Sequence, residues 1–333
     1  MKRARKILGV VALVSVIAAG GFLAFFSLKY PDAGPTPTIK VEATPARLER
    51  GSYLANHVSV CMDCHSTRDW QLVSGPIVPG TEGKGGERFD ESMGFPGTIY
   101  ARNITPAGIG QWTDGELYHA ITTGISRDSH ALFPLMPYQS YNNLSEEDLL
   151  SIITYIRSLK PVENQILSTQ LNFPLNFIVK TIPEKHTPAA EPNRNNAFEY
   201  GKYLVNAASC IECHTQAVKG EKVKGMEFAG GREFPFPNGT IRTANITPDE
   251  ETGIGLWTKD VFISRFKAFA DSSSQRQNAD SAKYYTIMPW TMFAGMTNED
   301  LGAVYEYLRT IPPVKNQVEH FTAAPSQNPT ASK

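Results

Sequence analysis

Two short stretches of the 333-residue chain, CMDCH at 61–65 and CIECH at 210–214, place two cysteines and a histidine at the same spacing. They hold all four cysteines of the chain, so none is left over for a conventional structural disulfide. Side chains of these types can bind a metal ion, exchange electrons as a dithiol, or attach a porphyrin. Whichever chemistry applies, the chain carries it out twice.

Three kinds of site compete for this spacing. A zinc site needs four ligands, and each copy offers two cysteines and one histidine with no recurring fourth ligand. A thioredoxin-like redox pair needs a βαβ setting, which the Gly- and Pro-rich surroundings do not supply. Covalent haem attachment uses the whole motif, because thiols three positions apart meet two vinyl groups while the histidine binds iron. The motif therefore predicts two covalently bound haem c groups, held by the thiols of Cys61, Cys64, Cys210 and Cys213 and by the imidazoles of His65 and His214.

Features around the two motifs recur in the same order and at a nearly constant offset along the chain. A Gly-x-Tyr-Leu stretch at 51–54 returns at 201–204, and Asn-Ile-Thr-Pro at 103–106 returns at 245–248. Gly-Ile-Gly-x-Trp-Thr at 108–113 returns at 253–258. This pattern indicates one duplicated domain rather than a short-period repeat. Asn103 and Asn245 are expected to satisfy backbone groups of loops.

The sixth ligand of each iron is predicted from the same duplication. Met136 and Met288 are each followed by proline and an aromatic residue, and each lies at a closely similar distance along the chain after the second cysteine of its copy. Met93, Met226 and the remaining histidines lack such a partner. A methionine beside proline usually packs in a core, but recurrence after each motif favours ligation. Both haems are therefore expected to be low-spin, with His–Met ligation that raises the reduction potential.

The predicted fold class is all-α, with two tandem cytochrome c domains after an N-terminal transmembrane helix. Each copy ends in an amphipathic helix that begins with a capping motif, Ser145 with Asp148 and Thr297 with Asp300, and the Gly/Pro-rich middle indicates loops. The predicted boundaries are an anchor at 1–28, a Pro-rich spacer at 29–45, domain 1 at 46–162, a linker at 163–197, domain 2 at 198–318 and a flexible tail at 319–333. The linker's modest apolar cluster at 167–182 is expected to pack against a domain.

The N-terminal segment at 1–28 differs from the rest of the chain. Basic residues at 2–6 precede an uncharged, mostly apolar run from Ile7 to Leu28, which as a helix would span roughly 33 Å. A cleaved signal peptide is the alternative, but the run continues beyond the small residues at 18–21. The expected location is the cytoplasmic membrane, in a single pass with both domains on the periplasmic side. The net charge is −1 for the chain and −6 beyond Lys29, so nucleic acid is not expected as a partner.

The motifs together resemble the cytochrome c subunits of bacterial membrane-bound dehydrogenases that oxidise alcohols, sugar acids or nicotinate. The resemblance covers nearly all of residues 46–318 and includes GISRD at 124–128 and LFPLMPY at 132–138. It implies that electrons pass from a separate catalytic subunit to quinone or a terminal oxidase. Alcohol-type subunits commonly carry three haem domains and attach near the C-terminus, whereas this chain has two domains and an N-terminal anchor. The second copy also lacks Ser-Arg-Asp and has a polar insertion around 271–283.

The leading functional hypothesis is therefore an electron carrier rather than an enzyme, with a periplasmic dehydrogenase or other donor on one side and the respiratory chain on the other. The alternative is a dihaem enzyme, such as a peroxidase or an oxidase of small sulfur compounds, which would need one haem with a displaceable distal ligand. A haem sensor would instead expose a ligand-gated distal site. The matched methionines favour the carrier.

Overall fold

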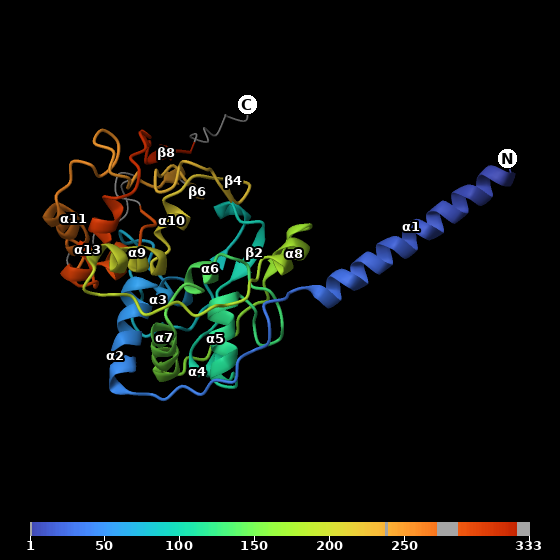
Figure 1. The fold of residues 1–333 in the computed structure, drawn as a ribbon, viewed down its shortest axis with the longest axis horizontal. Helices are drawn as coiled ribbons and strands as arrows, with labels where there is room; N and C mark the ends of the chain where they lie inside the picture. Colours follow the sequence, from blue (N-terminus) through green and yellow to red (C-terminus); the bar gives the residue numbers. More distant parts are fainter. Residues whose placement is uncertain (1, 237–238, 272–285, 325–333) are drawn as a thin grey trace, which may run out of the picture.

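The computed structural model describes residues 2–236, 239–271 and 286–324; most of the polar insertion of the second copy and the end of the chain lie outside these ranges. Figure 1 shows a helix-rich body from which one long helix projects. The helical elements are α1 (Lys2–Lys29), α2 (Pro45–Tyr53), η1 (Leu54–Val58), α3 (Cys61–His65), η2 (Glu91–Met93), α4 (Pro106–Ile109), α5 (Asp114–Thr123), α6 (Tyr138–Tyr141), α7 (Glu146–Ser158), α8 (Leu175–Ile178), η3 (Val179–Thr181), α9 (Ala197–Ala207), α10 (Cys210–Cys213), α11 (Lys259–Lys267), α12 (Trp290–Phe293) and α13 (Asn298–Leu308). The strands are β1 (Arg88–Phe89), β2 (Gly97–Tyr100), β3 (Gln170–Leu171), β4 (Ala217–Val218), β5 (Glu221–Lys222), β6 (Glu233–Phe236), β7 (Gly239–Arg242) and β8 (Phe321–Ala323).

Each copy is built around a crossing of its first and last helices. In the first copy α2 packs on α7, and in the second copy α9 packs on α13. Both crossings are centred on a glycine of the repeated Gly-x-Tyr-Leu stretch. A Cβ on Gly51 would lie 1.9 Å from the Ser151 carbonyl oxygen, and a Cβ on Gly201 would lie 1.9 Å from that of Ala303. Any larger residue would force the two helices apart, so the repeated glycine is required by packing.

The capping motifs of α7 and α13 form only in part. Ser145 Oγ accepts the Asp148 N–H at 3.3 Å, and Thr297 Oγ1 accepts the Asp300 N–H at 3.0 Å. The reciprocal bond of a full capping box would need a longer acidic side chain to return to the N-cap N–H. A tyrosine from the opposite copy accepts that N–H instead, Tyr203 for Ser145 at 3.3 Å and Tyr53 for Thr297 at 3.1 Å.

The same two tyrosines complete a reciprocal interface between the copies. Tyr53 donates its hydroxyl to Asp300 Oδ2 at 2.6 Å, and Tyr203 donates to Asp148 Oδ2 at 2.6 Å. Arg50 adds a two-pronged ion pair to Asp148, with 2.7 and 2.8 Å distances, and has no arginine counterpart in the second copy. The buried apolar residues of both copies form one continuous cluster. The duplicated halves therefore pack as two parts of one body.

Short strands are present in the described residues, so the all-α prediction is incomplete. In each copy a hairpin is joined by a third antiparallel strand from the segment after the last helix, in the orders β1-β2-β3 and β6-β7-β8. These third strands lie beyond the predicted ends of the two domains, at 162 and 318. β3 comes from the predicted linker and β8 from the predicted flexible tail, so the linker packs on a domain as expected but the tail is ordered at 321–323. The strands are very short and several begin at or near glycines, which leaves little alternating pattern to detect.

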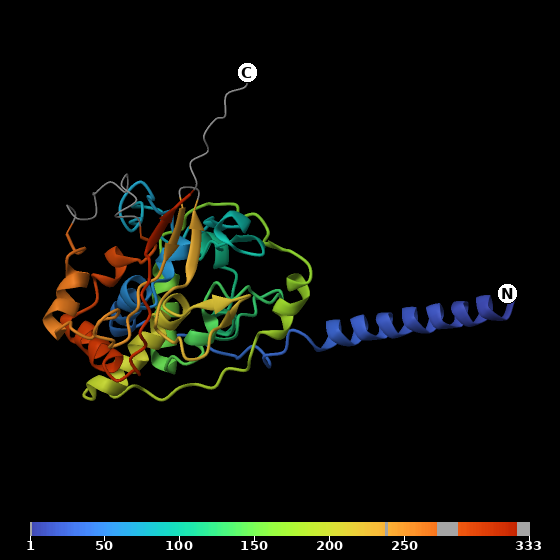
Figure 2. The same ribbon diagram turned by 90° about the horizontal axis from the view of Figure 1, so that it is seen from above.

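α1 extends away from the body in both views (Figure 1, Figure 2). Within the described residues, Arg3–Lys29 is the one helix that is long and apolar enough to cross a membrane, and none of its apolar window is buried inside the protein. A signal sequence would meet the same criterion of length and composition. The prediction of an apolar N-terminal helix is confirmed.

Candidate haem-binding sites

Both motifs begin immediately after a residue with left-handed backbone. Val60 has φ 42° and Ser209 has φ 53°, and these residues precede Cys61 and Cys210. Such φ values are strained for residues other than glycine, above all for β-branched valine. The strained residue ends the preceding helix and turns the chain so that α3 and α10 can each begin at the first cysteine. Nothing in the composition or spacing of the sequence predicted it.

Each motif histidine is fixed by one hydrogen bond through Nδ1. His65 Nδ1 lies 2.7 Å from the Arg102 carbonyl oxygen, and His214 Nδ1 lies 2.8 Å from the Ala244 carbonyl oxygen. A carbonyl can only accept, so Nδ1 carries the proton and Nε2 keeps its lone pair. Burial lowers the pKa of both imidazoles. Both rings are therefore neutral at pH 7 and present Nε2 as the nitrogen available to iron, which is the arrangement expected of a metal-ligating histidine.

The loops around each motif histidine and around the carbonyl that it bonds, Arg102 or Ala244, are held by the same hydrogen bonds in both copies. The N–H of Gly85 bonds to the His65 carbonyl at 2.8 Å, and that of Gly230 bonds to the His214 carbonyl at 2.7 Å. Asn103 Nδ2 donates to the Val162 carbonyl and Asn245 Nδ2 to that of Val314, both at 2.8 Å. The prediction that both asparagines satisfy loop backbone groups is confirmed. The Asn-Ile-Thr-Pro stretch thus joins the histidine loop to the segment after the last helix.

The four thiols form no disulfide, and Cys61 and Cys210 lack the surroundings of a reactive thiolate. Burial raises the pKa of Cys61 and of Cys210 to about 12, so both are protonated at neutral pH. Redox-active dithiols instead have lowered pKa values. Among the residues that the structure describes, no three His, Cys, Asp or Glu side chains are grouped so as to hold a metal ion directly. This geometry supports neither the zinc interpretation nor the thioredoxin-like one.

Met136 and Met288 occupy the same local turn. The N–H of Tyr138 bonds to the Met136 carbonyl at 2.8 Å, and that of Trp290 bonds to the Met288 carbonyl at 2.8 Å. The intervening prolines have φ −80°, ψ 55° and φ −78°, ψ 60°. These values define an inverse γ-turn, for which the proline ring presets φ. Each methionine side chain is half-buried and packs against the core cluster, so both are placed alike in the two copies.

These observations fit haem c. Haem attachment of the c type with His–Met ligation requires a particular set of groups. Each copy supplies them: a neutral imidazole with Nε2 available, two protonated cysteines three positions apart, and a methionine fixed by a rigid turn.

Apart from the left-handed residues, the sequence also did not reveal the tyrosines that cross between copies. The repeat of Tyr53 and Tyr203 was visible, but their partners required the fold.

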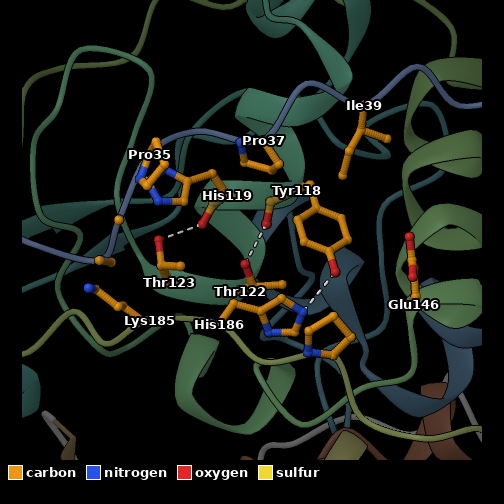
Figure 3. A pocket seen from close by; sticks show the side chains of 13 residues that line it. Pro35, Pro37, Ile39, Tyr118, His119, Thr122, Thr123, Glu146, Lys185 and His186 are labelled. Carbon is orange, nitrogen blue, oxygen red and sulfur yellow. Dashed lines mark hydrogen bonds between the residues drawn. The ribbon is translucent and has the colours of Figure 1, made fainter.

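A separate cavity of about 420 Å³ lies between the spacer, α5 and the linker (Figure 3). None of the motif cysteines and histidines and neither Met136 nor Met288 lines it. In it Tyr118 Oη lies 2.7 Å from His186 Nε2, and His186 Nδ1 lies 3.0 Å from Asn142 Oδ1. His119 Nε2 is buried with no hydrogen-bond partner in the structure. The cavity marks where the spacer after α1 docks on the first copy.

Comparison with known proteins finds a family match in the second half of the chain. Residues 198–312 match the family model described as Cytochrome c. The second half of the chain is therefore similar to cytochrome c, a family whose members attach haem c covalently.

Individual relatives show which kinds of cytochrome c protein the chain resembles. The chain is 28% identical over 304 residues to the cytochrome c subunit of alcohol dehydrogenase (quinone) from Gluconacetobacter polyoxogenes, covering 86% of this chain and 60% of that protein. It is 27% identical over 238 residues to the gluconate 2-dehydrogenase cytochrome c subunit of Pantoea cypripedii, covering 66% and 50%. It is 27% identical over 265 residues to a diheme cytochrome c-type protein of Cereibacter sphaeroides, covering 77% and 83%. The chain thus spans less than two thirds of the length of the alcohol dehydrogenase subunit, and the predicted resemblance to dehydrogenase cytochrome c subunits is confirmed.

Proposed function

We propose that the chain is a dihaem electron carrier with two tandem cytochrome c domains. One haem c is attached through Cys61 and Cys64, with His65 and Met136 as axial ligands. The other is attached through Cys210 and Cys213, with His214 and Met288. The single observation that carries the proposal is the duplicated histidine geometry, in which both Nδ1 atoms are bonded to a backbone carbonyl at 2.7 and 2.8 Å.

When bound, haem c supplies a one-electron iron couple, and the protein's part is to set its ligands and surroundings. The histidine bonds hold each imidazole in one tautomer and one orientation. The proline-fixed γ-turns limit the movement of the methionines between redox states. Matched ligands in both copies suit a carrier better than a catalyst, which needs an open iron position.

The packing of the copies supports passage of electrons between them. The buried apolar residues of both copies form one continuous cluster, against which Cys61 of the first motif and Cys210 of the second both pack. Because the reciprocal tyrosine bonds fix the two copies relative to each other, the distance between the haems is expected to be constant.

The location and partners follow from α1 and from the relatives. We propose that α1 anchors the chain in the cytoplasmic membrane, with both domains on the periplasmic side. The alcohol and gluconate dehydrogenase subunits named above suggest a dehydrogenase as donor. Quinone or a terminal oxidase is the proposed acceptor.

Intact mass spectrometry of the chain purified from membranes tests the cofactor content. The expected mass includes two porphyrins, and the double variant Cys210→Ala/Cys213→Ala should retain one. A polypeptide mass with no porphyrin would overturn the proposal. Addition of peroxide to the reduced protein tests the carrier role, because catalytic turnover rather than slow stoichiometric reoxidation would contradict it.

A further inference from the structure

The segment between the first motif and its hairpin is longer than its counterpart and reaches into the second copy. The chain from His65 to Gly85 is several positions longer than the chain from His214 to Gly230, although both glycine N–H groups make the same bond. The longer segment contains Ser74, which is 1% exposed and has left-handed backbone with φ 64°. Its side chain contacts the Met288 turn.

Ser74 bonds to both ends of that γ-turn. Its hydroxyl donates to the Met288 carbonyl oxygen at 2.6 Å, and its Oγ accepts the Trp290 N–H at 2.9 Å. The turn already has an internal bond between these two groups. Ser74 thus adds a second clamp from the opposite copy to the backbone that carries the proposed iron ligand.

Ser74 is in turn held from the first haem motif. Arg68, which is 7% exposed, donates from Nε to the Gly75 carbonyl at 2.6 Å and also bonds to the Ser74 carbonyl. The same guanidinium pairs with Asp63, which lies between the first two cysteines, and stacks 4.2 Å from the centre of the Trp70 ring. A continuous path of polar contacts therefore runs from the first motif, through Arg68 and Ser74, to Met288.

We propose that Ser74 is a positioning residue for the sixth ligand of the second haem, supplied by the first copy and oriented by Arg68. This inference rests on the proposed His–Met ligation. If Ser74 has this role, the two copies are not independent, because the first copy constrains the distal ligand of the second haem.

Ser74→Ala removes both bonds while keeping a residue with a Cβ at this position. The reduction potential of the second haem is expected to fall, and its affinity for carbon monoxide to rise about threefold to tenfold, because the methionine is held less firmly. The first haem should be unchanged. The redox step that moves in Met288→His identifies the second haem, and the far-red sulfur-to-iron charge-transfer band of the ferric protein reports the methionine bond directly.

Two further variants make the test decisive. Ser74→Gly relieves the left-handed strain, so a selective effect on the second haem would show loss of the hydroxyl rather than misfolding. Ser158→Ala removes a hydroxyl bonded to a carbonyl within α7 and should leave both haems unchanged. If both haems are present but neither Ser74 variant alters the second, the inference is wrong. If the wild-type chain carries no haem, the proposed function itself fails.

A second, independent observation concerns an apolar patch beside the end of α1. Phe173 is 81% exposed, Phe177 37% and Ile178 46%, and these residues lie in and just before α8. The Phe177 ring lies 6.3 Å from that of Phe26 and 6.1 Å from that of Phe173, measured between centroids. Figure 1 shows α8 close to the body-side end of α1.

The position of this patch fits the surface of a bilayer. Phe26 lies in the last turns of the apolar run that would span the membrane, so its neighbour Phe177 lies at the depth where the hydrocarbon ends. Lys180 Nζ lies 5.8 Å from the centre of the Phe177 ring, and Lys29 Nζ lies 5.5 Å from that of Tyr30. Aromatic rings with lysines beside them are typical of membrane–water interfaces. We infer that the outer leaflet of the lipid bilayer covers residues 173–178 and so orients the first copy.

The test uses the full chain in phospholipid vesicles, with lipids brominated on the acyl chain near the headgroup as quenchers. Phe173→Trp should add fluorescence that these lipids quench, whereas Leu256→Trp, at a 74% exposed site in the second copy, should add fluorescence that they do not. Equal lack of quenching at both sites, with the chain still resistant to alkaline extraction, would overturn the inference and favour a protein partner at the patch. Release of the chain by alkali would refute the membrane anchor instead.

Discussion

Ser209 combines two unfavourable features at one residue. Its φ of 53° is left-handed, and its buried hydroxyl has no hydrogen-bond partner. The haem motif starts at the next residue, so the strained conformation brings Cys210 to the start of α10. Local strain of this kind persists only where the surrounding structure determines it, and it is common at functional sites.

Ser209→Gly is therefore expected to stabilise the protein by about 1 kcal/mol, because glycine accepts the left-handed conformation and removes the unpaired hydroxyl. Denaturant unfolding of the haem-loaded chain measures the change. Ser209→Ala separates the two effects, since it removes the hydroxyl but keeps the strain. A destabilised glycine variant would contradict this interpretation of the backbone.

Met136→His tests a ligand in the first copy. The first haem should remain attached but its reduction potential should fall, because a second imidazole favours ferric iron more than a thioether does. Met93→His is the matched control, since Met93 lies in η2 and has no methionine counterpart in the second copy. An unchanged redox titration of Met136→His would exclude Met136 as a ligand.

At the scale of elements, the helix crossings depend on single glycines. Gly201→Ala should destabilise the second copy by about 3 kcal/mol or prevent its folding, because the new methyl group would overlap the Ala303 carbonyl. Gly302→Ala lies in the partner helix of that crossing, α13, where a Cβ would meet Lys259 at 3.6 Å. That variant should be neutral or slightly stabilising. Thermal unfolding compares the two, and equal stabilities would contradict the proposed crossing.

The sequence predicted the elements with strong local signals. The apolar run, the N-caps of α7 and α13 and the repeated motifs were all detectable, because hydrophobic period and capping residues act over a few positions. The third strands were not, since β3 and β8 exist only through pairing with β2 and β7 far away in the chain. The contact of Ser74 with the Met288 turn could not be predicted either, because nothing in the sequence around a loop serine indicates which distant backbone groups it will bond. The proposed ligand types rest on spacing in the sequence, whereas the contacts that position these residues required the fold.

The spacer after α1 packs on the first copy at the cavity that is lined by the buried His119 and the half-buried His186. Burial lowers the pKa of His119 and of His186, while nearby Glu146 opposes the effect at His186. Lys185 and Tyr118 also line this cavity. Both histidines are therefore neutral in the folded protein at pH 7.

The lowered pKa values of these two histidines make the folded protein less stable at acidic pH. In the unfolded chain both imidazoles have a pKa near 6.5, so they bind protons more readily than they do in the folded protein. Their contribution to the free energy of unfolding is therefore fully present above pH 6.5 and is lost as the pH falls below it. The free energy of unfolding is expected to decrease between about pH 7 and pH 5, by at most ~1.4 kcal/mol per pH unit for each histidine. His119→Asn should reduce this slope. Urea unfolding at a series of pH values measures it, and an unaltered slope in His119→Asn would contradict the assignment.

In the proposed carrier, each half of the chain holds one iron between an imidazole and a thioether. Near-infrared magnetic circular dichroism of the oxidised chain distinguishes His–Met from bis-His ligation and low-spin from high-spin iron in one experiment. Two low-spin haems are expected, both with the His–Met charge-transfer signature. A high-spin iron or a bis-His signature at either haem would contradict it.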